Sequence, residues 1–511
     1  MKSVSLQSLK CRFRNVLILL SVLLIHGGFM ATGQVSTDSV LPGRFDSALV
    51  KFDTIPQLQN ATWGFCAVDI ATGTIWKQSH ARTSLIPAST LKPITTAAAL
   101  MLLGPDYRFK TVVQLSGTTE ATGVHQGNLV ICGSGDPTLG SDRFGGKTAI
   151  DSFFIAVLNE LKSRGIQSIS GRIIADAPDM GSQPVIPSWQ FEDLGYYFGA
   201  APSDINVFEN SILFTFYPGK KPGDPAKLAS TFPDAPYIAV INQVLTGPKG
   251  SGDRVQVTGV PWSNQRILTG SVPAGAKSLS VKGTLPDPPY QIAYMLHNFL
   301  AANGINVALP PTNSRLQEWS GEKDTLVSFP VYQYVSPPLK EIVYHINMRS
   351  VNLFAEALVG AIGDTLYRHG STDAGLLGVE SFLAGKRVNT AGIRLRDGSG
   401  LSRKNLLTTE FLATTLALCT REPWFNDFYS SFPVAGESGS VAGMFQKSPA
   451  RGNLRAKSGT LEGVKGFCGY ATNSGGRKIA YALIINNYTG SQYEVLREME
   501  WLLTLLCASA N

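Results

Sequence analysis

The sequence predicts an α+β fold: an antiparallel sheet flanked by helices, split by large strand-rich inserted domains. Two observations predict the sheet, because β-rich runs form a hairpin around Ala-Thr-Gly at 62–78 and a second around Asn-Ser-Gly-Gly at 463–488. Isolated hairpins are marginally stable, so we expect the two to share one sheet. A third observation predicts the insertion: residues 105–290 contain short β-like runs with Gly and Pro, and helical patterns return only at 289–305 and 338–363.

The N-terminus has the pattern of a secretory signal. Lys2, Lys10, Arg12 and Arg14 precede the apolar run 16–25, and small residues follow at 31–33. The run is too short for a membrane span. We therefore expect cleavage after residue 33 and a periplasmic or secreted protein.

The chain divides into one split domain and its insertion. At 511 residues it is long enough for about three domains. The apolar spacing of the helix at 493–508 suits either an interfacial anchor or packing on the sheet, and its acidic polar face favours packing. The expected segments are a signal peptide (1–33), a first segment of the split domain (34–104), two nested strand-rich inserted domains (105–290), a return from the insertion (291–335) and a second segment of the split domain (336–511).

Charge and composition exclude several function classes. The leader carries four of the seven excess positive charges, and no basic run with interleaved aromatic residues follows it, so nucleic acid is excluded as a partner. The five remaining cysteines are scattered and odd in number, which leaves at least one free or intermolecular. The six histidines lack metal-ligand spacing, so we expect no metal and no other cofactor. Loose membrane association stays open, and no oligomeric state is predicted.

The stretch "SLIPASTLKPITTAAAL" (84–100) places a hydroxyl and an amine one helical turn apart. If a helix begins near Thr90, Pro93 falls in its first turn, where a missing N–H costs least. Residues i and i+3 share a helix face, so Lys92 can reach Ser89. The N-terminal N–H groups favour a developing oxyanion, and a neutral lysine can act as general base.

The Ser-x-x-K spacing by itself does not identify a catalytic site, because a second Ser-x-x-K occurs at Ser320. That one lies in a polar stretch without a following apolar helix, and we interpret it as chance. Singly, Ser350 could be a helix cap and Lys457 an edge-strand residue. Yet "SVN" (350–352) in a helical run and "KSGT" (457–460) at the C-terminal hairpin follow Ser89 in the order S-x-x-K, S-x-N, K-[ST]-G. Penicillin-binding proteins and serine β-lactamases carry these three elements.

With these motifs and others, the chain resembles the D-alanyl-D-alanine carboxypeptidase/endopeptidase family of low-molecular-mass penicillin-binding proteins, class C. The similar segments include "GSGDPTL" (133–139), "RDGSGLSRKNLLT" (396–408) and "FPVAGESGSVAG" (432–443), while 188–210 resembles part of the family's inserted region. The first two motif serines are 261 residues apart, far more than in a plain β-lactamase. The resemblance implies a serine β-lactamase/DD-peptidase-like domain carrying insertions.

The resemblance also implies roles for the motif residues. Ser89 attacks the carbonyl between the terminal D-alanines, and Lys92, with a pKa depressed by Lys457, takes its proton. The N–H groups of Ser89 and Thr460 form the oxyanion hole. Ser350 and Lys457 pass a proton to the leaving amine. Asn352 and the hydroxyls of the third motif hold the substrate. The substrate-binding residues implied there are Ser458, Gly459 and Thr460.

Two more residues are implied at the side chain of the third stem-peptide residue, a diamino acid. Asp176 matches an acidic position of the family and Arg403 an arginine at the same site. Met180 stands where the family has an aromatic partner, and Asp176 could equally be a solvated turn carboxylate. Asp136 in "GSGDPTL" reads as a turn former.

The function predicted is a serine D-Ala-D-Ala carboxypeptidase/endopeptidase that acts on peptidoglycan stem peptides through an acyl-enzyme and is inhibited by β-lactams. A serine β-lactamase is the first alternative, which the long insertion disfavours. The second is a catalytically inactive wall-binding protein, which has no chemical reason to keep the whole motif set. A Ser-His-Asp hydrolase has little support, because no histidine stands in a nucleophile-elbow context.

Overall fold

The computed structural model describes residues 44–178, 185–322 and 326–510. The predicted leader, Met180 and Lys323 lie outside these described residues. Among the described helices, none is long and apolar enough to cross a membrane.

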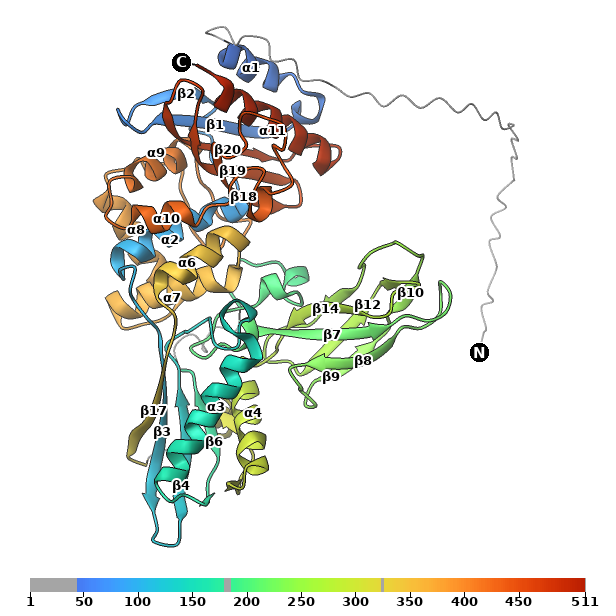
Figure 1. Cartoon of the computed structure of the whole chain (residues 1–511), viewed down its shortest axis with the longest axis vertical. Coiled ribbons are helices and arrows are strands. Elements are labelled where there is room, and N and C mark those ends of the chain that lie inside the picture. Colours follow the sequence, from blue (N-terminus) through green and yellow to red (C-terminus); the bar gives the residue numbers. More distant parts are fainter. Residues whose placement is uncertain (1–43, 179–184, 323–325, 511) are drawn as a thin grey trace, which may run out of the picture. The chain divides into compact units, whose positions relative to one another are not determined.

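The two terminal hairpins share one antiparallel sheet. Its order over the described residues is β18-β19-β20-β1-β2 (Figure 1). β1 pairs with β20 from Thr62 opposite Asn486 to Asp69 opposite Ile479, so the predicted pairing of the hairpins is confirmed. The strands are β1 (Thr62–Asp69), β2 (Ile75–Ser79), β18 (Leu454–Leu461), β19 (Val464–Thr472) and β20 (Lys478–Asn486).

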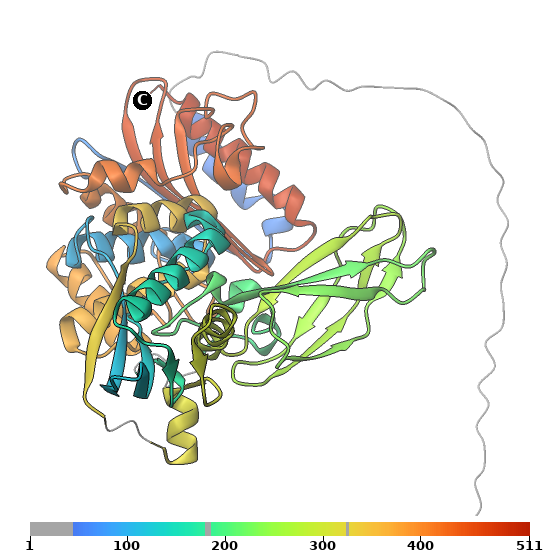
Figure 2. The ribbon, with the colours of Figure 1, turned by 60° about the horizontal axis from the view of Figure 1, so that its bottom comes forward.

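One face of this sheet is covered by the two terminal helices, α1 (Arg44–Asp53) and α11 (Gln492–Ala508) (Figures 1 and 2). The apolar stripe predicted for α11, which includes Met499 and Leu503, is buried in a cluster with strand residues such as Leu483. Packing on the sheet, as predicted from the acidic polar face, is therefore confirmed. The alternative of an interfacial anchor is wrong for this stripe, because its side chains already pack on the sheet.

Helices also cover the opposite face and enclose a larger core. Ile94, Leu358 and Leu412, from three of these helices, share a buried cluster with Ile484 of the sheet. β1, β19 and β20 consequently lie between two apolar layers, which explains their nearly unbroken burial. The helices are α2 (Lys92–Leu102), α6 (Leu339–Arg349), α7 (Asn352–Tyr367), α8 (Thr372–Gly385), α9 (Thr409–Cys419) and α10 (Phe425–Ser430).

The helical pattern at 338–363 is interrupted at the second motif. α6 ends where Ser350 adopts a left-handed conformation, with φ of 60°, and α7 begins at Asn352. The Ser350 N–H donates to the Ile346 carbonyl, so Ser350 closes α6 as a left-handed cap. The prediction that Ser350 lies within a continuous helical run is therefore wrong. The apolar pattern continues through the break because both helices bury the same face.

Residues 110–335 build further sheets. β3 (Lys110–Thr119) and β17 (Ser328–Val335) are antiparallel neighbours, so the chain leaves and returns side by side. In the described residues their sheet has the path β15-β5-β4-β3-β17, and β6 pairs with both β4 and β16. Its remaining strands are β4 (Val124–Cys132), β5 (Ser168–Ile169), β6 (Ile173–Asp176), β15 (Asn306–Val307) and β16 (Thr312–Asn313).

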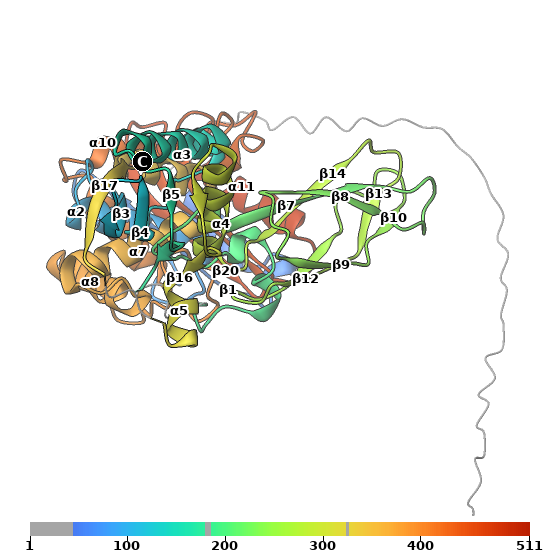
Figure 3. The same cartoon turned by 90° about the horizontal axis from the view of Figure 1, so that it is seen from below.

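Helices lie beside this sheet, α3 (Gly146–Ser163) near β17 and α4 (Pro288–Ala302) near β6 (Figure 3). The prediction of a strand-rich segment at 105–290 did not include α3. Its signal was present, because Ile150, Phe153 and Val157 recur at helical spacing and are buried. A short helix, α5 (Ser314–Ser320), follows β16.

Smaller sheets complete the middle of the chain and share one apolar core with α3 and α4. Their described orders are β14-β7-β8, β11-β12-β9 and β10-β13. The strands are β7 (Ser211–Tyr217), β8 (Lys227–Phe232), β9 (Ala239–Asn242), β10 (Leu245–Gly247), β11 (Gln256–Thr258), β12 (Gln265–Thr269), β13 (Ser271–Pro273) and β14 (Leu279–Thr284).

Candidate active site

Ser89 lies in a 3₁₀ turn, Ala88–Leu91, directly before α2. The helix therefore begins two residues later than predicted, and Pro93 occupies its first turn, as expected. Ala88 has a φ of 47°, a left-handed conformation that costs a residue with a side chain about 1–2 kcal/mol. Such strain persists where the surroundings over-determine the backbone. Ser89 is half-buried and lines a cavity of about 530 Å³, here called the catalytic cavity.

Lys92 is the buried partner of Ser89. Its side chain is fully buried, and Nζ lies 2.8 Å from Ser89 Oγ, 2.6 Å from Asn352 Oδ1 and 2.7 Å from the Ser399 carbonyl oxygen. An ammonium has three hydrogens for these three acceptors. Burial lowers the pKa of Lys92 to about 7, against the raising effect of the nearby Asp397 charge. The amine can thus be neutral near neutral pH.

Lys457, on β18, faces Ser350. Its Nζ donates to Ser350 Oγ at 2.8 Å and to the Ser458 carbonyl at 2.6 Å. The left-handed Ser350 makes this contact possible by leaving the axis of α6. Burial, and then the charge of Lys92, lower the pKa of Lys457 well below its usual value. The expectation that Lys457 depresses the pKa of Lys92 is therefore revised, since burial is the largest cause for both lysines.

The third motif lies on the edge strand β18 and presents two hydroxyls. Ser458 Oγ donates to Ser440 Oγ at 2.8 Å, and Lys465 Nζ donates to Thr460 Oγ1 at 2.7 Å. Gly459 is packed against the 3₁₀ turn Ala88–Leu91, which contains Ser89. A Cβ there would lie 2.8 Å from the Pro87 oxygen and 3.0 Å from the Ser89 nitrogen, so only glycine lets strand and turn approach this closely.

Asn352 forms hydrogen bonds both to Lys92 and to the segment around Phe198. While Oδ1 accepts from Lys92, Nδ2 donates to the Phe198 carbonyl at 2.7 Å. Phe198 and Tyr197 line the catalytic cavity together with Ser89, Ser350 and Thr460 of the third motif. The segment 188–210, which resembles part of the family's inserted region, thus supplies one wall of the cavity.

Two buried acidic residues support the site and were not singled out from the sequence. Glu356, on α7, accepts from the Gly398 and Ser399 N–H groups at 2.9 and 2.7 Å, and burial raises its pKa to about 8. Asp397 accepts from the Gly400 N–H at 2.8 Å and from Trp189 Nε1 at 2.9 Å. Together they hold the 397–400 loop, whose Ser399 carbonyl binds Lys92. A glutamate inside an apolar helix and the Asp-Gly-Ser-Gly turn were the available signals.

Of the two residues predicted at the diamino acid, only Arg403 is among the described residues that line the catalytic cavity. Arg403 lines the catalytic cavity, and its guanidinium donates to Gln190 Oε1 at 2.7 Å and to the Glu462 carbonyl at 2.9 Å. Asp176 ends β6 opposite Cys132 and is not among the described residues that line this cavity. Residues 179–184, which follow it and include Met180, lie outside the described residues.

The remaining candidates, Asp136 and Ser320, form local hydrogen bonds within a turn and at a helix end. Asp136 is buried and accepts from both the N–H and the hydroxyl of Thr138, at 2.8 and 2.7 Å, as a turn former does. Ser320 is exposed at the end of α5, and its hydroxyl donates to the Gln317 carbonyl. The described residues contain no cluster of His, Cys, Asp and Glu that could hold a metal ion.

A serine beside a buried lysine of lowered pKa, at the start of a helix, is the arrangement found in serine hydrolases that use lysine in place of histidine as base. The family follows from comparison with known proteins. The chain belongs to the D-Ala-D-Ala carboxypeptidase 3 (S13) family, whose model matches residues 47–504. It is a serine peptidase of the D-Ala-D-Ala carboxypeptidase class, and the family suggested by the motifs is confirmed.

Relatives agree with this assignment over most of the chain. A D-alanyl-D-alanine carboxypeptidase of an Actinomadura species is 30% identical and covers 85% of this chain and 79% of its own length. D-alanyl-D-alanine carboxypeptidase DacB of Haemophilus influenzae is 27% identical, over 84% and 86%. The crystal structure of penicillin binding protein 4 from that organism matches with a TM-score of 0.76, over 90% of this chain and 99% of that one, at 24% identity. At that identity it establishes the α+β fold alone.

Proposed function

We propose that Ser89, Lys92, Ser350, Asn352 and Lys457 carry out D-Ala-D-Ala carboxypeptidase and endopeptidase reactions on peptidoglycan stem peptides. The observation that carries this assignment is the 2.8 Å contact between Lys92 Nζ and Ser89 Oγ in a fully buried setting. Burial favours the neutral amine, which can accept a proton, and the contact gives that proton a direct path.

Acylation begins with neutral Lys92. Its lone pair takes the Ser89 proton as Oγ attacks the carbonyl carbon between the terminal D-alanines, and the carbonyl oxygen becomes an oxyanion. The N–H groups of Ser89 and Thr460 would hold that charge. The proton then passes from Lys92 towards the leaving nitrogen through Ser350, whose hydroxyl already accepts from Lys457. The C–N bond breaks, and D-alanine leaves as the amine.

Substrate recognition uses both sides of the catalytic cavity. The hydroxyls of Ser458 and Thr460, next to Gly459, would bind the terminal carboxylate, and Asn352 the amide of the stem peptide. Arg403 faces the cavity with a half-exposed guanidinium suited to the third residue. Asp176 stays a prediction for that subsite. In deacylation, water attacks the ester carbonyl and restores the Ser89 hydroxyl.

The same chemistry opens a β-lactam ring, because Ser89 would attack its carbonyl in the place of the peptide bond. Penicillin binding protein 4 of Haemophilus influenzae has been crystallised with a β-lactam. We therefore propose that β-lactams acylate and inhibit this protein. Slow hydrolysis of that acyl-enzyme distinguishes this proposal from a serine β-lactamase, and acylation itself distinguishes it from an inactive wall-binding protein.

We also propose that the split domain comprises 34–104 and 336–511, with 105–290 as its insertion and 291–335 as the return. The pairing of β17 with β3 and the separate apolar core of the middle segment support this division. Cleavage of 1–33 would leave the mature protein in the periplasm or outside the cell, where peptidoglycan lies.

The assignment is tested with labelled penicillin and a stem pentapeptide. We expect the mature protein to form a stable covalent adduct at Ser89 and to release D-alanine, and Ser89→Ala to do neither while keeping the native unfolding transition. Tryptic mapping locates the adduct. Rapid penicillin turnover without D-alanine release would instead identify a β-lactamase. Binding to wall sacculi with no acylation would leave only the wall-binding alternative.

The low pKa of Lys92 predicts a pH profile for acylation. Because only the neutral amine accepts a proton, we expect the second-order acylation rate to fall about tenfold per pH unit below pH 7 and to level off above it. Stopped-flow acylation between pH 5 and 9 measures this limb. Unfolding curves at the same pH values are the control, because loss of native protein would mimic it. A flat profile would exclude Lys92 as the base.

A further inference from the structure

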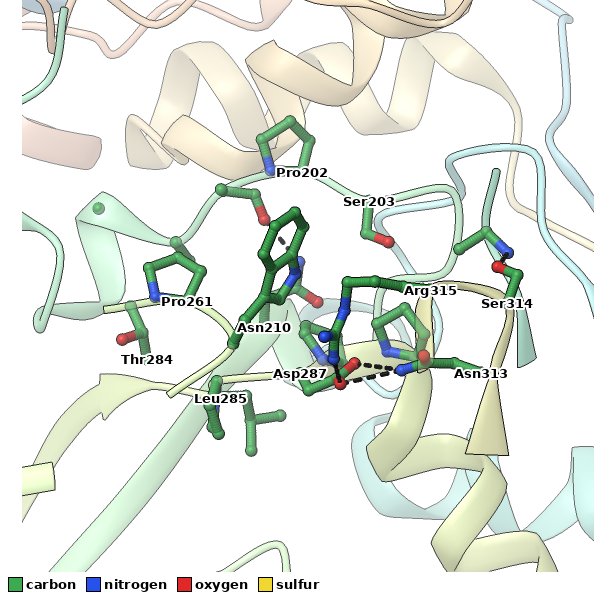
Figure 4. A pocket seen from close by; sticks show the side chains of 18 residues that line it. Pro202, Ser203, Asn210, Pro261, Thr284, Leu285, Asp287, Asn313, Ser314 and Arg315 are labelled. Carbon is green, nitrogen blue, oxygen red and sulfur yellow. Dashed lines mark hydrogen bonds and ion pairs between the residues drawn. The ribbon is translucent and has the colours of Figure 1, made fainter. Parts of the chain in front are cut away.

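A second cavity, of about 50 Å³, is lined by residues 199–203, which directly follow two residues that wall the catalytic cavity (Figure 4). This volume has room for a group of about four non-hydrogen atoms. Its wall is mostly apolar. We call it the proline-lined cavity, after Pro202, Pro261, Pro286, Pro288 and Pro289.

Two of the polar groups that line it are donors without partners among the described residues. Ser203 is only 7% exposed, and its hydroxyl has no hydrogen-bond partner in the described structure. Arg315 Nη1 is also buried and has no hydrogen-bond partner there. Figure 4 shows both residues at the cavity. A buried donor without a partner costs about 1–3 kcal/mol, so a ligand with an acceptor oxygen would recover this energy.

The charge of the cavity indicates that this acceptor is neutral. Arg315 is already paired with Asp287, whose carboxylate also accepts from Asn313 Nδ2 at 2.9 Å at both oxygens. The cation is therefore compensated, and the carboxylate has no need of a cationic ligand. A neutral carbonyl oxygen fits these donors better than a carboxylate or phosphate does.

Aromatic rings flank the same arginine. The guanidinium carbon lies 4.9 Å from the centre of the Trp262 ring, which lines the cavity, and 4.4 Å from that of Trp319. Trp319 is 63% exposed. The exposed indole of Trp319 contacts Trp262 and Arg315, and it offers an apolar surface next to the cavity. A sugar ring bearing an amide has this combination of an apolar face and a carbonyl group.

One short segment connects the two cavities. Tyr197 and Phe198 line the catalytic cavity, and Gly199 to Ser203 line the proline-lined cavity. The bond that Ser89 would attack follows the fourth residue of the stem pentapeptide, and four extended residues reach about 14 Å. The sugar attached to a peptide bound at Ser89 would thus lie within about 14 Å of that serine.

We propose that the proline-lined cavity binds the acetamido group of an N-acetylated sugar in the glycan strand that carries the stem peptide. The acetamido group has four non-hydrogen atoms, with an acceptor oxygen for Ser203 and Arg315 and a methyl group for the prolines. The inference rests on the proposed peptidase function and adds the glycan as a part of the substrate that the enzyme recognises.

The test uses the whole mature protein and the trimer of β-1,4-linked N-acetylglucosamine, with cellotriose, which lacks the acetamido groups, as ligand control. Titration calorimetry should detect the acetylated trimer and not cellotriose. Ser203→Ala, which removes one hydrogen bond, should weaken that binding about fivefold. Trp319→Ala is a second variant at an exposed position, and Tyr217→Ala removes an exposed aromatic elsewhere as variant control.

Kinetics with two substrates complete the test. Ser203→Ala should raise KM about fivefold for a stem pentapeptide joined to its disaccharide and leave the free pentapeptide unchanged. Equal binding of the acetylated trimer and cellotriose, binding unaffected by both variants, or preferred binding of an alanine peptide would overturn the inference. Failure of the unmodified protein to release D-alanine from the free pentapeptide would count against the proposed function alone, because trimer binding requires no turnover.

Discussion

Lys92→Met should lower the second-order rate of penicillin acylation by about three orders of magnitude or more, because it removes the proposed general base and leaves Ser89 in place. The same variant should be no less stable than the wild type. Burial of the amine is unfavourable, as its lowered pKa indicates, and methionine fills the space without a charge. Mass spectrometry of the adduct and chemical denaturation measure the two effects.

The lowered pKa of Lys92 determines how the stability difference between Lys92→Met and the wild type changes with pH. In the unfolded chain Lys92 keeps its proton up to its ordinary pKa of 10.5, whereas in the folded protein it loses it near 7. Between these values the unfolded state binds more protons, so wild-type stability rises with pH relative to the methionine variant. The advantage of Lys92→Met should therefore be larger at pH 6 than at pH 9. Lys110→Met, at an exposed lysine, is the control. An advantage that grows with pH would contradict burial as the cause.

Gly400→Ala should be the most destabilising single change near the site. Gly400 has a φ of 81°, and a Cβ there would lie 1.9 Å from the Ala88 carbonyl oxygen. Either the 397–400 loop or the 3₁₀ turn Ala88–Leu91 must therefore move. We expect a loss of about 3 kcal/mol or more in the free energy of unfolding. Displacement of Ser89 by about 1 Å should also slow acylation about a hundredfold.

Gly104→Ala separates backbone strain from steric conflict. Gly104 has a similar φ of 87°, but no atom lies within 4 Å of the position of a Cβ. It should lose only about 1 kcal/mol and keep its acylation rate. Thermal unfolding and penicillin acylation of both variants provide the comparison. Equal losses in the two variants would show that the close approach of the 397–400 loop to Ala88 is not what positions Ser89.

The predicted features that were confirmed rest on local patterns. The two hairpins and α11 could be predicted because residues with strand or helix periodicity are adjacent in the chain. The break at Ser350 could not, because α6 and α7 bury one continuous apolar pattern and the left-handed residue is held by Lys457, more than a hundred residues away. α3 was missed although the helical spacing of its apolar residues was visible, because the Gly and Pro residues on either side led to the prediction of a strand-rich segment.

The candidate site shows the same division. Motif order predicted Ser89 and its partners without any structure. Asp397 was missed although its contact with the Gly400 N–H is local and belongs to the Asp-Gly-Ser-Gly turn. Glu356 was missed, since a carboxylate that binds N–H groups of a distant loop leaves no spacing in the chain. The cause of the Lys92 pKa was misassigned for the same reason. Burial depends on every element packed around a side chain, whereas a charge partner can be guessed from a motif.

By itself, the sequence determined the family, the order of the motifs and the two ends that form one sheet, because these depend on residue identity and local periodicity. The tertiary structure alone decided which groups surround Lys92, which residues of segment 197–203 line each of the two cavities, and which carboxylates hold the 397–400 loop. Contacts between residues hundreds of positions apart depend on packing, and packing fixes distance, burial and charge together.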